Sequence, residues 1–180
     1  MKIALGQINV VCNNPEQNFL EMKKLIEEAK KNKADLIVFS EMCVGGYFLM
    51  DKYLDENYCE YLNSFNERIL NLSDDIGIIF GNIYYEQIGK IVKGRDGRKA
   101  RYNAAMFAYN RKWVKHVNNA LDGIHIKHLN PDYRVFDDSR YFLSGLEVSE
   151  HLFKCSNGLI SQGNDYDKRR TGTIKDRSTI

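Results

Sequence analysis

The sequence predicts an α/β protein whose first strands run parallel. Residues 2–10 are dominated by isoleucine, alanine, leucine and valine, as expected of a buried strand. Residues 35–40 form a second apolar run, and a helical pattern lies between the two runs. A strand, a helix of ordinary length and another strand make a βαβ unit, in which the two strands pair in parallel.

The predicted helix has a clear start and one apolar face. Asn14 can cap it, Pro15 suits its first position, and Gln17 can complete a capping box. Apolar residues then recur at the spacing of one helix face: Phe19, Met22, Ile26 and Ala29. Lysines gather at the far end, where the helix dipole favours cations: Lys30, Lys31 and Lys33.

The later elements continue the α/β pattern. They are a turn over 44–47, a helix over 51–72, a strand over 76–85, a Gly- and Lys/Arg-rich loop over 89–100, and a hairpin with arms 101–109 and 111–117. The hairpin is expected to turn at Tyr109-Asn110-Arg111. No internal repeat is found, and residues 161–180 are almost entirely polar.

Size and composition narrow the classes of function. A chain of 180 residues with 43% apolar and 28% charged residues suits one globular domain. No apolar run approaches the ~20 residues of a membrane-spanning helix, so no membrane partner is expected. The net charge of +2 comes from residues 163–180, and the basic residues of 90–101 alternate with glycines as in a solvated loop. A nucleic-acid partner is therefore not expected either.

The cysteines and the amino terminus indicate a cytoplasmic protein. The chain starts directly with an apolar strand and lacks the separate regions of a signal peptide. The four cysteines are unevenly spaced and form no CxxC pair, so we expect reduced thiols: Cys12, Cys43, Cys59 and Cys155. Of these, Cys12 and Cys43 fall in or beside predicted core elements and are expected to be buried small hydrophobes.

Two charged residues beside apolar runs are candidates for catalysis. Glu41 ends the strand 35–40, at the edge where α/β sheets place their ligands, and partial burial there would suit a general base. Lys127 lies among apolar neighbours, where a fixed positive charge could stabilise an oxyanion. The plainer alternatives are a solvated strand-end acid and a surface lysine. His125 and His128 flank the lysine without a clustered third ligand, so no metal site is expected.

The order of motifs adds a family resemblance. The run Ala4-Leu5-Gly6-Gln7-Ile8-Asn9, and then Ala34-Asp35-Leu36-Ile37-Val38-Phe39-Ser40-Glu41 with Gly46-Tyr47, resembles the opening of the nitrilase (carbon–nitrogen hydrolase) superfamily. Arg101-Tyr102-Asn103-Ala104-Ala105 resembles its central strand. Residues 127–142, which read KHLNPDYRVFDDSRYF, are similar to the lysine loop in the glutaminase domain of glutamine-dependent NAD(+) synthetases. The likeness covers about residues 2–148 and implies an incomplete α-β-β-α sandwich.

The resemblance implies roles for four residues. Glu41 would be the general base and Lys127 the stabiliser of the tetrahedral intermediate, while Tyr47 and Tyr133 match positions near the glutamine pocket. The implied reaction is hydrolysis of the side-chain amide of glutamine, or of another small amide, through attack by a cysteine thiolate. No cofactor is expected in this domain. ATP and an NAD precursor would belong to a separate synthetase domain or subunit, which nothing in this sequence resembles.

The likeness stops near residue 152, before the family's nucleophile. We therefore expect a partial carbon–nitrogen hydrolase domain over 1–153 and a divergent polar tail over 154–180. Cys155 is the only cysteine after Lys127, but it comes early for the nucleophile and has polar neighbours, so we expect the nucleophilic cysteine to be missing from this chain. A truncated or frameshifted longer gene and a degenerate, non-catalytic or partner-binding relative both explain this pattern. Uncovered apolar faces would then favour marginal stability or homo-oligomers.

Overall fold

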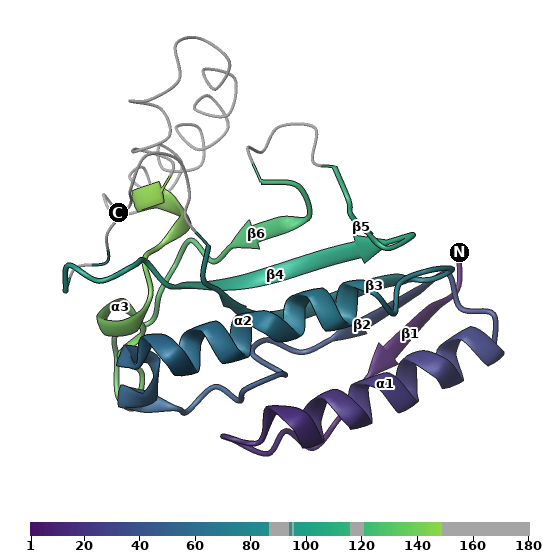
Figure 1. Cartoon of the computed structure of the whole chain (residues 1–180), viewed down its shortest axis with the longest axis horizontal. Coiled ribbons are helices and arrows are strands. Elements are labelled where there is room, and N and C mark those ends of the chain that lie inside the picture. Colours follow the sequence, from purple (N-terminus) through teal and green to yellow (C-terminus); the bar gives the residue numbers. More distant parts are fainter. Residues whose placement is uncertain (87–93, 95, 116–120, 149–180) are drawn as a thin grey trace, which may run out of the picture.

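A mixed six-stranded sheet forms the centre of the protein, shown in Figure 1. The structure, a computed structural model, describes residues 1–86, 94, 96–115 and 121–148. The strands are β1 (Ile3–Gly6), β2 (Leu36–Phe39), β3 (Gly77–Tyr84), β4 (Tyr102–Tyr109), β5 (Lys112–Trp113) and β6 (Ile124–Ile126). The helices are α1 (Pro15–Lys31), the 3₁₀ helix η1 (Met50–Leu54), α2 (Glu56–Leu70) and α3 (Asp138–Tyr141). Cys155, the tail 154–180 and half of the loop 89–100 lie outside the described residues.

The sheet changes from parallel to antiparallel pairing at β3. Strands β1, β2 and β3 pair in parallel, which confirms the βαβ prediction. β4 runs antiparallel to β3, and its other edge pairs with both β5 and β6. The predicted hairpin is present, and its turn residues Asn110 and Arg111 have φ of 52° and 54°. Two consecutive residues with positive φ are typical of the tight turns that join twisted strands.

The first helix follows its sequence signals closely. The Asn14 side chain accepts a hydrogen bond from the Gln17 backbone N–H, and Pro15 is the first helical residue. The Gln17 side chain closes the cap differently from a standard capping box, because it accepts from the Asn14 side-chain amide. The predicted apolar stripe is buried throughout, and Lys30 and Lys31 lie in the last turn.

Two predicted elements have different bounds in the structure. The predicted helix 51–72 is divided into η1 and α2 at Asp55, because the Asp55 carboxylate accepts from the backbone N–H groups of Asn57 and Tyr58 and caps α2. The first strand ends at Gly6 rather than continuing to residue 10. Gly6 pairs with Phe39, the last residue of β2, so the chain beyond it has no partner strand.

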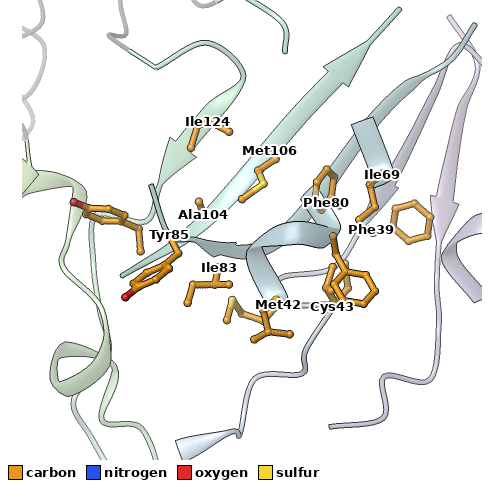
Figure 2. Packing of buried hydrophobic residues seen from close by; sticks show 14 of the residues in the cluster. Phe39, Met42, Cys43, Ile69, Phe80, Ile83, Tyr85, Ala104, Met106 and Ile124 are labelled. Carbon is orange, nitrogen blue, oxygen red and sulfur yellow. The ribbon is translucent and has the colours of Figure 1, made fainter. Parts of the chain in front are cut away.

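The two long helices of the described residues, α1 and α2, cover the same face of the sheet. α1 packs on β1 and β2, and α2 packs on β3 and β4 (Figure 1). Cys43, Ile69, Phe80 and Met106 all belong to the buried cluster beneath them, part of which Figure 2 shows. The prediction of a buried Cys43 is therefore confirmed. Cys12 was predicted wrongly, since it is exposed in the loop between β1 and α1.

Apolar side chains remain exposed on the opposite face of the sheet. Successive side chains of a strand point to opposite faces, and Ala4 and Gly6 face the helices together with Ile37 and Phe39. Ile3 and Leu5 therefore point to the opposite face, where they are 49% and 81% exposed to solvent. No described element covers this side over β1, whereas Ile83 and Asn103 on the same face of β3 and β4 are buried. No helix in this part of the chain is both long and apolar enough to cross a bilayer.

Candidate active site

A tight turn after β2 places Glu41 over the neighbouring strand. Met42 has a φ of 49°, and the turn is fixed by hydrogen bonds from Cys43 N to Gly81 O (2.9 Å) and from Gly81 N to Ser40 O (3.2 Å). A Cβ atom at Gly81 would lie 2.6 Å from the Glu41 Cα. Only glycine allows this approach of one backbone to another. Glu41 is thus held at the carboxyl end of the parallel strands, as its position in the sequence predicts.

The backbone of Lys127 is held on both sides just after β6. Its N–H donates to Asn103 O of β4 at 2.9 Å, and its carbonyl accepts from Gly145 N at 2.9 Å. Ile126 in β6 pairs with Ala104 in β4, and both side chains face the helix-covered side of the sheet. Asn103 precedes Ala104 in β4, so its side chain points to the opposite face. Lys127 therefore lies beside Asn103 on the face away from the helices.

Glu41 and Lys127 form an ion pair at this end of the sheet. The Lys127 Nζ lies 2.8 Å from Glu41 Oε1, 3.1 Å from the Tyr47 hydroxyl and 3.2 Å from Asp138 Oδ2. The lysine side chain is 25% exposed and the Glu41 side chain 46% exposed. The Glu41 side chain is thus more open to solvent than the partial burial expected from the sequence.

Burial and hydrogen bonds within the site set the pKa values of Lys127 and Tyr47. Burial alone lowers the pKa of Lys127, but its hydrogen bonds to Glu41 and Tyr47 outweigh burial and raise the pKa above the ordinary lysine value. Burial, reinforced by the hydrogen bond to Asp138, raises the pKa of Tyr47 to about 12. At neutral pH the lysine is therefore a cation and the tyrosine a neutral phenol, which donates to Asp138 Oδ2 at 2.5 Å.

Tyr133 lies farther from the charged pair than Tyr47. Its side chain is 62% exposed, and its ring packs edge-on against Phe136 at a centroid distance of 5.5 Å. The Phe136 ring in turn lies 5.7 Å from the Tyr47 ring. Tyr133 is thus connected to the site through aromatic contacts and forms no hydrogen bond with Glu41 or Lys127. Its role at a substrate pocket stays a prediction.

Two polar residues of the site escaped the sequence reasoning. Asp138 is buried at the start of α3 and contacts both Lys127 and Tyr47. Asn103 is 2% exposed in β4 and donates from its side-chain amide to Glu41 Oε1 at 2.6 Å. An asparagine among the apolar and aromatic residues of 102–109 was a usable signal for Asn103. Asp138 follows another aspartate in a polar loop, and nothing in the local pattern distinguishes it.

The family follows from comparison with known proteins. The sequence profile described as carbon–nitrogen hydrolase matches residues 2–150. This chain is a member of the carbon–nitrogen hydrolase family. The nitrilase-type α/β fold and the likeness to NAD(+) synthetase glutaminase domains that the sequence suggested are thereby confirmed.

Relatives of this carbon–nitrogen hydrolase include much longer enzymes. The glutamine-dependent NAD(+) synthetase of Acinetobacter baylyi is 31% identical over 153 residues, which cover 84% of this chain and 25% of that protein. The Aquifex aeolicus enzyme of the same name is 28% identical over 158 residues, covering 84% and 24%. The chain therefore spans about a quarter of the length of these relatives.

Solved structures agree with this assignment. Glutamine-dependent NAD+ synthetase from Acinetobacter baumannii, in complex with ADP, superposes with a TM-score of 0.60 at 31% identity, over 79% of this chain and 24% of that one. An amidase from Nesterenkonia sp. superposes with a TM-score of 0.62 over 81% of this chain and 48% of its own. At 17% identity, the amidase shows the shared fold alone.

The described cysteines of this carbon–nitrogen hydrolase do not reach the charged pair. Burial raises the pKa of Cys43 and of Cys59 to about 12, so both stay protonated at neutral pH. The Cys43 thiol contacts Gly81 O, and the Cys59 thiol contacts Tyr53 O. Neither these two nor the exposed Cys12 forms a hydrogen bond with Glu41 or Lys127. A nucleophilic thiol at this site would have to come from outside the described residues.

The histidines next to Lys127 do not build a metal centre with other described residues. The rings of His125 and His128 stack at a centroid distance of 5.5 Å with 25° between their planes. Within the described ranges, no three histidine, cysteine or acidic side chains gather closely enough to hold a metal ion.

Proposed function

We propose that this chain hydrolyses the side-chain amide of glutamine, as the amino-terminal part of an NAD(+) synthetase-like enzyme. The observation that carries the proposal is the ion pair between Glu41 and Lys127, at the carboxyl end of the parallel strands. Glutamine as the substrate is supported by the likeness to glutamine-dependent NAD(+) synthetases and by the sequence of the 127–142 loop.

The two charges can act in succession. Glu41 accepts the proton of a cysteine thiol, and the thiolate attacks the amide carbon. Once protonated, Glu41 no longer neutralises Lys127, and the lysine charge becomes available to the oxyanion that develops on the amide oxygen. The proton then passes from Glu41 to the departing ammonia, and water hydrolyses the thioester to release glutamate.

Asp138 and Tyr47 keep the lysine in place through these steps. Lys127 contacts three oxygen-bearing groups, so the loss of the Glu41 charge leaves it bound to Tyr47 and Asp138. In the proposed enzyme the ammonia is used by a separate synthetase domain, where ATP and the NAD precursor bind.

A second candidate function is a non-catalytic, partner-binding scaffold. It is favoured by the absence of a reactive thiol beside Glu41 among the described residues. The two candidates differ in whether the purified chain turns over glutamine.

Ammonia release from glutamine tests the proposal. We expect release by the parent chain and its loss in Glu41→Gln and Lys127→Ala. Glu21→Gln and Lys23→Ala are matched controls, because both residues are exposed on α1, and they should retain the parent rate. Release should be lost in Cys155→Ala as well, because Cys155 is the one cysteine outside the described residues and the proposed attack needs a thiol that the described cysteines do not supply. A parent chain that is folded by circular dichroism but releases no ammonia would overturn the proposal in favour of the scaffold.

A further inference from the structure

A buried asparagine connects the two charged residues of the site. Asn103 donates from its side-chain amide to Glu41 Oε1 at 2.6 Å, and its backbone carbonyl accepts from Lys127 N at 2.9 Å. It lies in the middle of the sheet, where β4 pairs with β3 and its residue partner is Ile83. One residue of a rigid strand thus contacts the base through its side chain and the lysine through its backbone.

Both hydrogen bonds to the Glu41 carboxylate end on the same oxygen. Oε1 accepts from the Asn103 amide and also from Lys127 Nζ at 2.8 Å. Within the described part of the chain, no donor reaches Oε2, while the side chain remains 46% exposed. The carboxylate is therefore asymmetric, with one anchored oxygen and one oxygen that is open to a proton donor.

We infer that Asn103 is a positioning residue that makes Oε2 the proton-accepting oxygen of Glu41. This inference rests on the proposed function, because it assigns the atom that takes the thiol proton. A quarter-turn about the Cγ–Cδ bond of Glu41 would break the hydrogen bonds of Asn103 and Lys127 together, whereas a half-turn would only exchange two equivalent oxygens, so Oε2 denotes the oxygen that these two donors leave free. Two donors, one in β4 and one directly after β6, therefore fix the plane of the carboxylate.

The chemistry of the asparagine side chain suits this task. Its N–H binds the carboxylate without adding a second positive charge, so the pair with Lys127 remains the one ion pair that the described residues form with Oε1. An aspartate of the same shape would place a second carboxylate against Glu41 above its own pKa. Below that pKa its O–H could again donate a hydrogen bond.

The pH dependence of activity separates positioning from a purely structural role. We expect Asn103→Leu and Asn103→Asp to lower kcat by up to about 100-fold with little change in KM, as for a misplaced catalytic group. For Asn103→Asp, the ratio of variant to parent kcat should rise as the pH falls, because protonation restores the donor. For Asn103→Leu the ratio should stay constant. Equal and pH-independent losses in both variants would overturn the inference.

Asn82 provides a matched control. It is also a fully buried asparagine, in β3, but its amide donates to Leu62 O and Asn66 on the helix-covered side. Asn82→Leu removes a buried amide of the same kind without touching Glu41, so kcat of its folded fraction should match the parent. A kcat loss in Asn82→Leu as large as in Asn103→Leu would show a general effect of buried amides and contradict the inference.

A readout without catalysis keeps the inference separate from the proposed function. Urea denaturation of Asn103→Leu, Glu41→Leu and the double variant forms a double-mutant cycle. The cycle measures a hydrogen bond to a charged carboxylate. The unfolding constant of the double variant should therefore differ by about tenfold from the value expected if the two single effects were independent. Additive effects would refute the anchoring contact, whether or not the chain releases ammonia. A coupled cycle in a chain without activity would refute only the proposed function.

Discussion

Gly81→Ala probes the backbone contact that places Glu41. The new Cβ would lie 2.6 Å from both the Glu41 Cα and the Met42 N, whereas ordinary van der Waals contacts begin near 3.4 Å. Both close atoms belong to the backbone, so the turn must move by something close to 1 Å. Overpacking of this kind costs about 1–3 kcal/mol of unfolding free energy. A displacement of about 1 Å at a catalytic group can lower the rate by about 100-fold.

Gly77→Ala is the matched control in the same strand. Its Cβ would come within 2.9 Å of the end of the Leu36 side chain, which can rotate away, and 3.2 Å from the Phe107 ring. Urea denaturation should therefore show a clearly larger loss of stability for Gly81→Ala than for Gly77→Ala, and ammonia release should fall only for Gly81→Ala. Equal denaturation midpoints with unchanged activity would refute the argument that Gly81 positions the base.

Two further predictions concern the ion pair and the open face of the sheet. Because the pKa of Lys127 is raised in the folded chain, the lysine stabilises the fold fully below its ordinary value of 10.5, and this stabilisation disappears as the pH rises through the higher folded value. The difference in unfolding free energy between the parent and Lys127→Met, measured by urea denaturation, should thus be constant at neutral pH and shrink in strong alkali. A difference that grows in alkali would contradict the stabilisation by the charged lysine. Leu5 is 81% exposed on the side of β1 that no described element covers, so Leu5→Glu should reduce self-association in sedimentation velocity, while Leu20→Glu on the outside of α1 should not. A parent chain that is monomeric at all concentrations and melts sharply would disprove the second prediction.

The local signals in the sequence predicted elements whose causes are themselves local. Asn14 and Pro15 marked the start of α1 because a helix cap is formed by neighbours in the chain. Asn110 marked the hairpin turn because it tolerates positive φ. Asp55 shows the limit of this reasoning, since an apolar pattern that continues across it concealed a capping side chain.

The partners of the site residues depended on pairing across the sheet. Glu41 could be placed from its strand alone, and Lys127 from the family resemblance. Their contact with Asn103 and Asp138 follows from the register of β3, β4 and β6 and from the path of the loop before α3. Neither feature can be obtained from the spacing of residues along the chain. Cys12 was misjudged for a similar reason, because the end of β1 is set by the length of its partner β2.

The most direct test of the proposed chemistry follows the nitrogen of the substrate itself. Glutamine labelled with ¹⁵N at the side-chain amide can be incubated with the parent chain and with Glu41→Gln, and the amide and ammonium signals can be followed by NMR. We expect the parent to convert the amide signal into ammonium and Glu41→Gln to leave it unchanged. An amide signal that persists with the folded parent, or that disappears equally fast with Glu41→Gln, would contradict this expectation.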